Sequence, residues 1–199
     1  SRKDELGLLA ESFNKMVEEI STLYRSMEQK VEDRTLQMRT ASEIAQAAIS
    51  SNNREDILYR TVQLLTERFE YEYAAIYLLD ETGTAVVLKG ASQKDVEETS
   101  FRELRLPLIT QNILTWVAAN SKARIVNDLS DDTGNTDHLI PGARSELAIP
   151  IILEEQVLGV LDIQSQSANA FDPDTASVFR ALTNQVAVGL RNVDTLEST

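Results

Sequence analysis

The stretch that decides the fold of this chain is LAIPIILEEQVLGVLDI, residues 147–163. Two apolar segments, 147–153 and 157–163, flank the short polar connection 154–156. Both are rich in Val, Ile and Leu, so the pattern predicts two antiparallel strands joined as a hairpin. Pro150 has no backbone N–H to donate, which indicates an edge strand or a bulge at that position.

A second hairpin is predicted upstream. Residues 73–79 (YAAIYLL) are almost wholly apolar, residues 80–83 (DETG) carry turn chemistry, and residues 84–88 (TAVVL) are again typical of a strand. The continuous apolar content of 73–79 predicts that helices cover both faces of the sheet.

The remaining elements complete an α+β domain. Short strands are expected at 104–106 and 124–126. Helices are expected after Asn53, over 110–120 and after Asp172-Pro173. Residues 128–142 are expected to be a long polar loop that could form a lid or a site wall. The predicted fold class is therefore α+β, with an antiparallel sheet between helical layers.

Apolar residues at alternating spacings of three and four mark both ends of the chain. The pattern is typical of a coiled-coil heptad and predicts a parallel homodimer with the sheet domain in series between two coils. The predicted dimer seam contains Leu6, Leu9, Phe13, Met16, Ile20 and Leu23 near the start, and Phe179, Leu182, Val186 and Val193 near the end.

The N-terminal heptad is interrupted between Met27 and Val31, where a step of four follows another step of four. Such a stutter locally unwinds a left-handed supercoil. It is either a tolerated irregularity in a rod or a point at which the helix pair has two nearly equal packings that a signal could bias.

Charge and composition exclude several functions. The chain has 19 Lys and Arg against 32 Asp and Glu, a net charge of −13, which would repel nucleic acid. It has no Cys, so disulfides and thiolate chemistry are excluded. No apolar run is long enough for a membrane span, and the first residues lack the apolar centre of a signal peptide, so a cytoplasmic segment is expected.

The chain resembles two protein families. Asp4-Glu5-Leu6-Gly7 with Phe13-Asn14-Lys15-Met16 resembles the second helix of a HAMP signal-relay domain. From about Ala41 to Leu196 the chain resembles a GAF domain, a sensory module of kinases, cyclases and phosphodiesterases; RSELAIPI at 144–151 and LGVLDI at 158–163, followed by Phe171, carry this resemblance.

The resemblance implies a domain order: the C-terminal part of HAMP at 1–25, a signalling helix at 26–52 and a GAF domain with its exit helix at 53–196. It further implies a longer native protein with an upstream membrane helix and a downstream output domain, most often a histidine kinase. This segment is then the cytoplasmic part of an inner-membrane receptor and has no catalytic residues of its own.

The resemblance also implies a small-molecule pocket on one face of the sheet. Covalent bilin is excluded because the chain has no Cys, and the signature of cyclic-nucleotide GAF domains is absent. No metal site is expected, since the acidic residues of loop 128–142 do not follow calcium-loop spacing. The candidate ligand-binding residues are Tyr77, Trp116, Asp128, His138, Arg144 and Ser145.

Each candidate has a purely structural alternative. His138 could be an axial haem ligand, but a solvated loop histidine is the default interpretation. Arg144 could meet a ligand at the pocket rim or, as the favoured alternative, anchor the loop carboxylate of Asp128. Tyr77 and Trp116 could stack on a flat ligand or belong to the core.

Three functional hypotheses follow. The first is the input and relay segment of a membrane-bound sensor histidine kinase whose GAF domain binds a small molecule. The second is a GAF domain without a ligand that acts as a dimerising and transmitting spacer. A further alternative to the kinase is that the segment is the input module of a nucleotide cyclase. The third, a catalytic domain, has little support because no nucleophile with a base and no paired-carboxylate site is evident.

Overall fold

The computed structural model describes residues 2–50, 53–92, 104–131, 134 and 136–197 of the 199-residue chain. The chain divides into two units, Ser1–Gln37 and Met38–Thr199. Within the described residues, no helix is both long enough and apolar enough to cross a bilayer.

The first unit is helical. It belongs to α1 (Arg2–Ile49), which runs without a break through the predicted stutter at Met27 and Val31 and stops directly before Ser50. The six predicted seam residues from Leu6 to Leu23 are 56% to 67% exposed in the single chain. The apolar stripe is therefore present and is not buried against the rest of this unit.

Helix starts follow the predicted capping residues. α2 (Arg54–Phe69) is capped by Asn53, whose side-chain oxygen accepts from the backbone N–H of Glu55 at 2.8 Å. α4 (Pro173–Glu197) begins after Asp172, whose Oδ1 accepts from the Thr175 N–H at 2.7 Å. Each cap satisfies a backbone donor that has no partner inside the helix.

The second unit contains a six-stranded antiparallel sheet in the order β3-β2-β1-β6-β5-β4. Both predicted hairpins are present, β1 with β2 and β5 with β6, and β6 also pairs with β1. The strands are β1 (Tyr73–Leu79), β2 (Ala85–Ala91), β3 (Arg105–Pro107), β4 (Arg124–Val126), β5 (Ser145–Leu153) and β6 (Gln156–Ser165).

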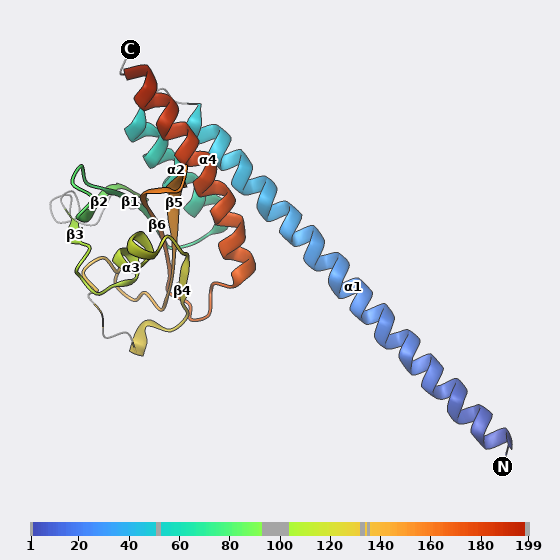
Figure 1. Cartoon of the computed structure of the whole chain (residues 1–199). Coiled ribbons are helices and arrows are strands. Elements are labelled where there is room, and N and C mark those ends of the chain that lie inside the picture. Colours follow the sequence, from blue (N-terminus) through green and yellow to red (C-terminus); the bar gives the residue numbers. More distant parts are fainter. Residues whose placement is uncertain (1, 51–52, 93–103, 132–133, 135, 198–199) are drawn as a thin grey trace. The chain divides into compact units, whose positions relative to one another are not determined.

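Helices cover both faces of this sheet, as the continuous apolar run of β1 predicts. α2 and α4 pack on one face, together with Ala41, Ile44 and Ala45 from the last turns of α1. On the other face lies α3 (Ile113–Asn120), which contacts β2, β5 and β6 (Figure 1). The α+β fold class with its antiparallel sheet between helical layers is confirmed.

Pro150 is tolerated because of where β4 ends. β4 pairs only with Glu146–Ala148 of β5, so no described strand pairs with that side of β5 at Pro150. A register shift between Ile151 and Ile152 lies immediately beyond it. The short edge strand and the neighbouring bulge together accommodate the missing N–H.

The prediction that the exit helix, α4, contributes to a dimer seam is wrong. Phe179, Leu182, Val186 and Val193 are 0% to 3% exposed within a single chain and belong to the apolar cluster between α4 and the sheet. They are core residues and cannot pair with a second chain while the domain is folded. The heptad spacing of α4 arises because a helix lying on a sheet also buries one face at a period near 3.6 residues.

Candidate functional site

A polar floor lies on the α3 face of the sheet. Asp162 of β6 stands directly opposite Ala75 of β1 and Ala148 of β5. In the next cross-strand row Gln164 stands between Tyr73 and Glu146. Because alternate residues of a strand share a face, these side chains project to the same side, and the small Ala75 and Ala148 flank the carboxylate of Asp162.

The floor is tied to the long loop through hydrogen bonds. His138 Nε2 lies 2.8 Å from Glu146 Oε1, with His138 2% exposed and Glu146 fully buried. The Ile140 N–H donates to Gln164 Oε1 at 2.8 Å, and Gln164 Nε2 donates to the carbonyl of His138 at 3.1 Å. Gln164 therefore anchors the segment around His138 to the sheet.

Burial dominates the electrostatics of this floor. It raises the pKa of Asp162 well above its usual range, and the nearby Glu146 carboxylate adds to that shift. His138 and the hydrogen bond from Gln164 Nε2 to Asp162 Oδ2, at 2.7 Å, act in the opposite direction. The pKa of Tyr77 is likewise raised well above normal by burial, then by Asp162. An empty floor therefore favours a protonated Asp162.

Three buried oxygen atoms of the floor, Asp162 Oδ1 and the hydroxyls of Tyr73 and Tyr77, make no hydrogen bond of good geometry among the described residues. The two hydroxyls still lie close enough to interact with each other, and Asp162 lies close enough to interact with Glu146. Each unpaired buried polar group destabilises a fold by about 1–3 kcal/mol, so native cores rarely contain several together. The cluster is therefore a candidate ligand-binding site.

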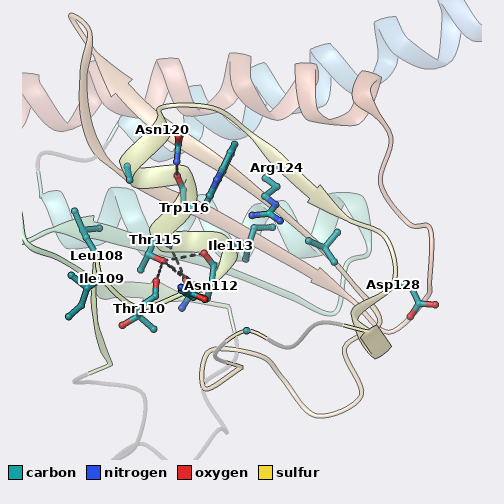
Figure 2. A pocket seen from close by; sticks show the side chains of 14 residues that line it. Leu108, Ile109, Thr110, Asn112, Ile113, Thr115, Trp116, Asn120, Arg124 and Asp128 are labelled. Atoms are coloured by element: carbon teal, nitrogen blue, oxygen red, sulfur yellow. Dashed lines mark hydrogen bonds between the residues drawn. The ribbon is translucent and has the colours of Figure 1, made fainter.

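A groove of about 640 Å³ lies at the start of α3 and along β4. Figure 2 shows the side chains that line it. Arg124 of β4 lies over the ring of Trp116 on α3, 5.1 Å from its centroid. Asn112 caps α3 with its oxygen, and its buried Nδ2 has no partner among the described residues. Val126, which also lines the groove, pairs with Glu146, so groove and floor are neighbours on one sheet face.

The predicted residues are divided between these features. Tyr77 belongs to the floor, while Trp116 and Asp128 line the groove. His138 is buried beside Glu146, so the interpretation as a solvated loop histidine is wrong. It could not be foreseen because a lone loop histidine gives no sign of which strand it will meet.

Arg144 and Ser145 have structural partners. Arg144 Nη2 lies 3.9 Å from Asp128 Oδ2, which agrees with the favoured interpretation that Arg144 anchors this loop carboxylate. Both side chains are about half exposed, so the ion pair is weak. The pKa of Asp128 is lowered mainly by hydrogen bonds from Ser130 and only secondarily by Arg144. The Ser145 hydroxyl donates to the carbonyl of Ser167 at 2.7 Å.

Glu146, Asp162 and Gln164 were not predicted as site residues. The signal was present, because each is a polar residue inside an otherwise apolar strand and such a residue must find a special environment.

Among the residues that the structure places, no group of three or more His, Asp or Glu is arranged to hold a metal ion.

Replacing Asp162 by Asn should stabilise the empty domain in a pH-dependent way. The raised pKa means that the folded chain retains a proton which the unfolded chain releases above about pH 4, so the aspartate destabilises the fold increasingly as pH rises. We expect Asp162→Asn to raise the melting temperature by roughly 4 °C at pH 7.5, and by less at pH 4.5. Circular dichroism melts at the two pH values measure the difference.

The control for this melt is Asp128→Asn, which removes an exposed carboxylate whose pKa is lowered. It should leave the melting temperature unchanged or slightly lower at pH 7.5. An equal gain for Asp162→Asn at both pH values would show that ionisation of the aspartate is not the cause.

The antiparallel sheet, with α2 and α4 on one face and α3 on the other, and the polar floor with the groove at the start of α3 define the class of this domain as α+β. The chain belongs to the GAF domain family, whose model matches residues 53–190, well over half of the chain. No curated protein matches the chain.

Solved structures agree with this assignment. The GAF domain of a phosphoenolpyruvate-protein phosphotransferase from Acinetobacter superposes with a TM-score of 0.69 at 20% identity, covering 82% of this chain and 98% of that one. A free methionine-R-sulfoxide reductase from Neisseria meningitidis, solved with its substrate, gives 0.71 at 19% identity, with 82% and 93% covered. Residues 122–287 of a methyl-accepting chemotaxis protein give 0.65 at 17% identity, with 78% and 99% covered. At these identities the likeness concerns the fold alone.

Proposed function

We propose that this chain is the sensory input and relay segment of a membrane-bound receptor of the two-component histidine kinase type. In this proposal residues 1–25 are the end of a HAMP domain, residues 26–52 a signalling helix and residues 53–196 a GAF domain that binds a small molecule. The segment acts as a parallel homodimer and catalyses nothing itself.

The observation that carries the proposal is the composition of α1. Its first part presents an exposed apolar stripe with heptad spacing, and its last turns contribute Ala41, Ile44 and Ala45 to the core of the GAF domain. One uninterrupted helix thus contains both a surface suited to a second chain and core residues of the ligand-binding unit. That is the arrangement a relay element requires.

The stripe is suited to a second copy of the chain for a physical reason. A run of large apolar side chains that are more than half exposed would be costly in water, and heptad spacing is the geometry in which two parallel helices bury each other's stripes. A ligand in the GAF domain can change the output only if it prefers one of two packings of such a helix pair.

Charging the seam should abolish the dimer. Phe13 and Ile20 occupy equivalent positions of successive heptads and are 63% and 57% exposed in the single chain. In a dimer their replacement by Asp places four carboxylates in the apolar seam, so we expect the dissociation constant to rise by at least about 100-fold. Sedimentation velocity of the 199-residue chain measures the oligomeric state.

The matched control is Asn14→Asp with Ser21→Asp, which adds the same charge one residue further along the same helix, off the stripe. This variant should sediment as the unchanged chain does. A dimer of undiminished affinity in the Phe13 and Ile20 variant, or a monomeric unchanged chain at all accessible concentrations, would refute the homodimeric relay.

The ligand-binding half of the proposal is tested separately from the coil. Native mass spectrometry of the purified chain should reveal a stoichiometric small molecule, or a screen by thermal shift should identify one. Protein that is empty and unresponsive across such a screen would favour the spacer function instead.

A further inference from the structure

The polar floor offers one specific set of unfilled hydrogen bonds. Asp162 stands opposite Ala75 on β1, and Tyr73 and Tyr77 lie two positions away on either side of that alanine. Diagonal neighbours across two strands are about 7–8 Å apart at Cα, which long aromatic side chains span. The two phenols interact with each other and with Asp162, so the three side chains meet around one point, and each has a buried oxygen that makes no hydrogen bond of good geometry among the described residues.

The chemistry of these atoms favours a cation that donates several hydrogen bonds. When Asp162 is ionised, all three oxygens can accept a hydrogen bond, and each phenol hydroxyl can also donate one. Two acidic side chains, Asp162 and Glu146, share the floor with His138 as the cationic side chain when it is protonated. A primary ammonium group has three N–H donors and one positive charge. We propose that the GAF domain recognises a small molecule through a primary ammonium group bound by Asp162 Oδ1 and the hydroxyls of Tyr73 and Tyr77.

Two further observations support an amine as the occupant. A metal ion is disfavoured because the described residues hold no cluster with metal-ligand arrangement. Ala75 and Ala148, the residues opposite Asp162, are the smallest side chains that still fit a strand, so neither neighbour projects over the carboxylate. A cation there would also offset the free-energy cost of ionising Asp162, which burial imposes.

This inference rests on the proposed function, since it names the ligand class of the GAF domain. The probes are L-amino acids that have a primary amine, ethanolamine, putrescine and agmatine, each compared with its N-acetylated counterpart, which keeps the shape but loses the cation. Thermal shift on the 199-residue chain selects binders, and isothermal titration calorimetry gives their dissociation constants.

We expect at least one amine of the panel to bind saturably, and its N-acetylated counterpart to bind at least about tenfold more weakly. Asp162→Asn should weaken binding by at least about tenfold, and Tyr77→Phe, which keeps the ring, by about three- to tenfold. Since Asp162→Asn should fold more stably than the unchanged chain, lost binding in that variant cannot be attributed to unfolding.

Glu67→Gln is the matched control, because it removes an exposed carboxylate of α2, the helix on the opposite face of the sheet, and leaves the floor and the groove intact. Its affinity for the amine should stay within about twofold of the unchanged chain. An amine whose binding depends on Asp128 but not on Asp162 would place the ligand in the groove and overturn the proposal.

Two other results would overturn it. One is the absence of saturable binding by every amine up to about 10 mM. The other is a neutral or anionic ligand whose affinity is unchanged in Asp162→Asn; in that case the sensory function stands and only the ammonium site falls. The dimer is tested by sedimentation of the seam variants, so its failure is visible independently.

Discussion

We expect Leu182→Asp to unfold the GAF domain in most of the protein. Leu182 is 1% exposed and lies in the apolar cluster between α4 and the sheet. Truncating a buried leucine costs about 2–5 kcal/mol, and an unpaired buried carboxylate adds several more. Because a domain of this kind is stable by only about 5–15 kcal/mol, we expect most of the Leu182→Asp protein to be unfolded at 25 °C. Circular dichroism and the fluorescence of Trp116 report the loss.

The control for this substitution is Val188→Asp on the same helix. Val188 is 42% exposed, so its carboxylate remains in water and the change in stability should stay below about 1 kcal/mol. The comparison also separates two accounts of α4. If Leu182 belonged to a dimer seam, Leu182→Asp would give a folded monomer. A Leu182→Asp protein that melts cooperatively, close to the melting temperature of the unchanged chain, would therefore contradict the assignment of Leu182 to the core.

Gly159→Ala should be the most damaging of the small substitutions. A Cβ at Gly159 would lie 2.1 Å from the carbonyl oxygen of Tyr77 and 2.9 Å from Cα of Leu78. Both are backbone atoms of the adjacent strand β1 in the middle of the sheet, so no side-chain rotation can relieve the overlap. We expect a cost of roughly 3 kcal/mol and a melting temperature lower by roughly 6–12 °C.

Gly7→Ala is the corresponding control. Gly7 lies inside α1, and a Cβ there meets no heavy atom within 4 Å. Alanine is the better helix former by about 1 kcal/mol, so α1 should be unharmed and the melt of the GAF domain unchanged. Differential scanning calorimetry measures the melting temperatures. If the Gly159→Ala protein melted at the same temperature as the unchanged chain, β1 and β6 would have to be further apart at this point than the structure has them.

The two heptad stripes show where sequence reasoning ends. Ile20 in α1 and Leu182 in α4 belong to stripes with the same alternation of three and four residues, yet one is 57% exposed and the other 1%. Spacing reports that one face of a helix is apolar. It does not report whether that face meets another chain or the sheet of its own domain, because both surfaces select the same residues.

The polar floor escaped prediction for a related reason. Glu146 and Asp162 are recognisable as acids within apolar strands, and His138 as a lone imidazole in a loop. Their partnership depends on the register of β5 with β6 and on the position of the loop, which involve separations of up to 26 residues along the chain. Short-range pattern contains no information on which of these residues meet.

The order of amino acids by itself determined the elements of this protein: the hairpins, the capped helices, the long N-terminal helix and the resemblance to a GAF domain, since each depends on neighbours a few residues away. The tertiary structure alone decided which helix stripe is core and which buried polar atoms converge on one point. Those outcomes depend on contacts between distant segments, and the free energy of such contacts comes from surfaces that exist only when the sheet has formed.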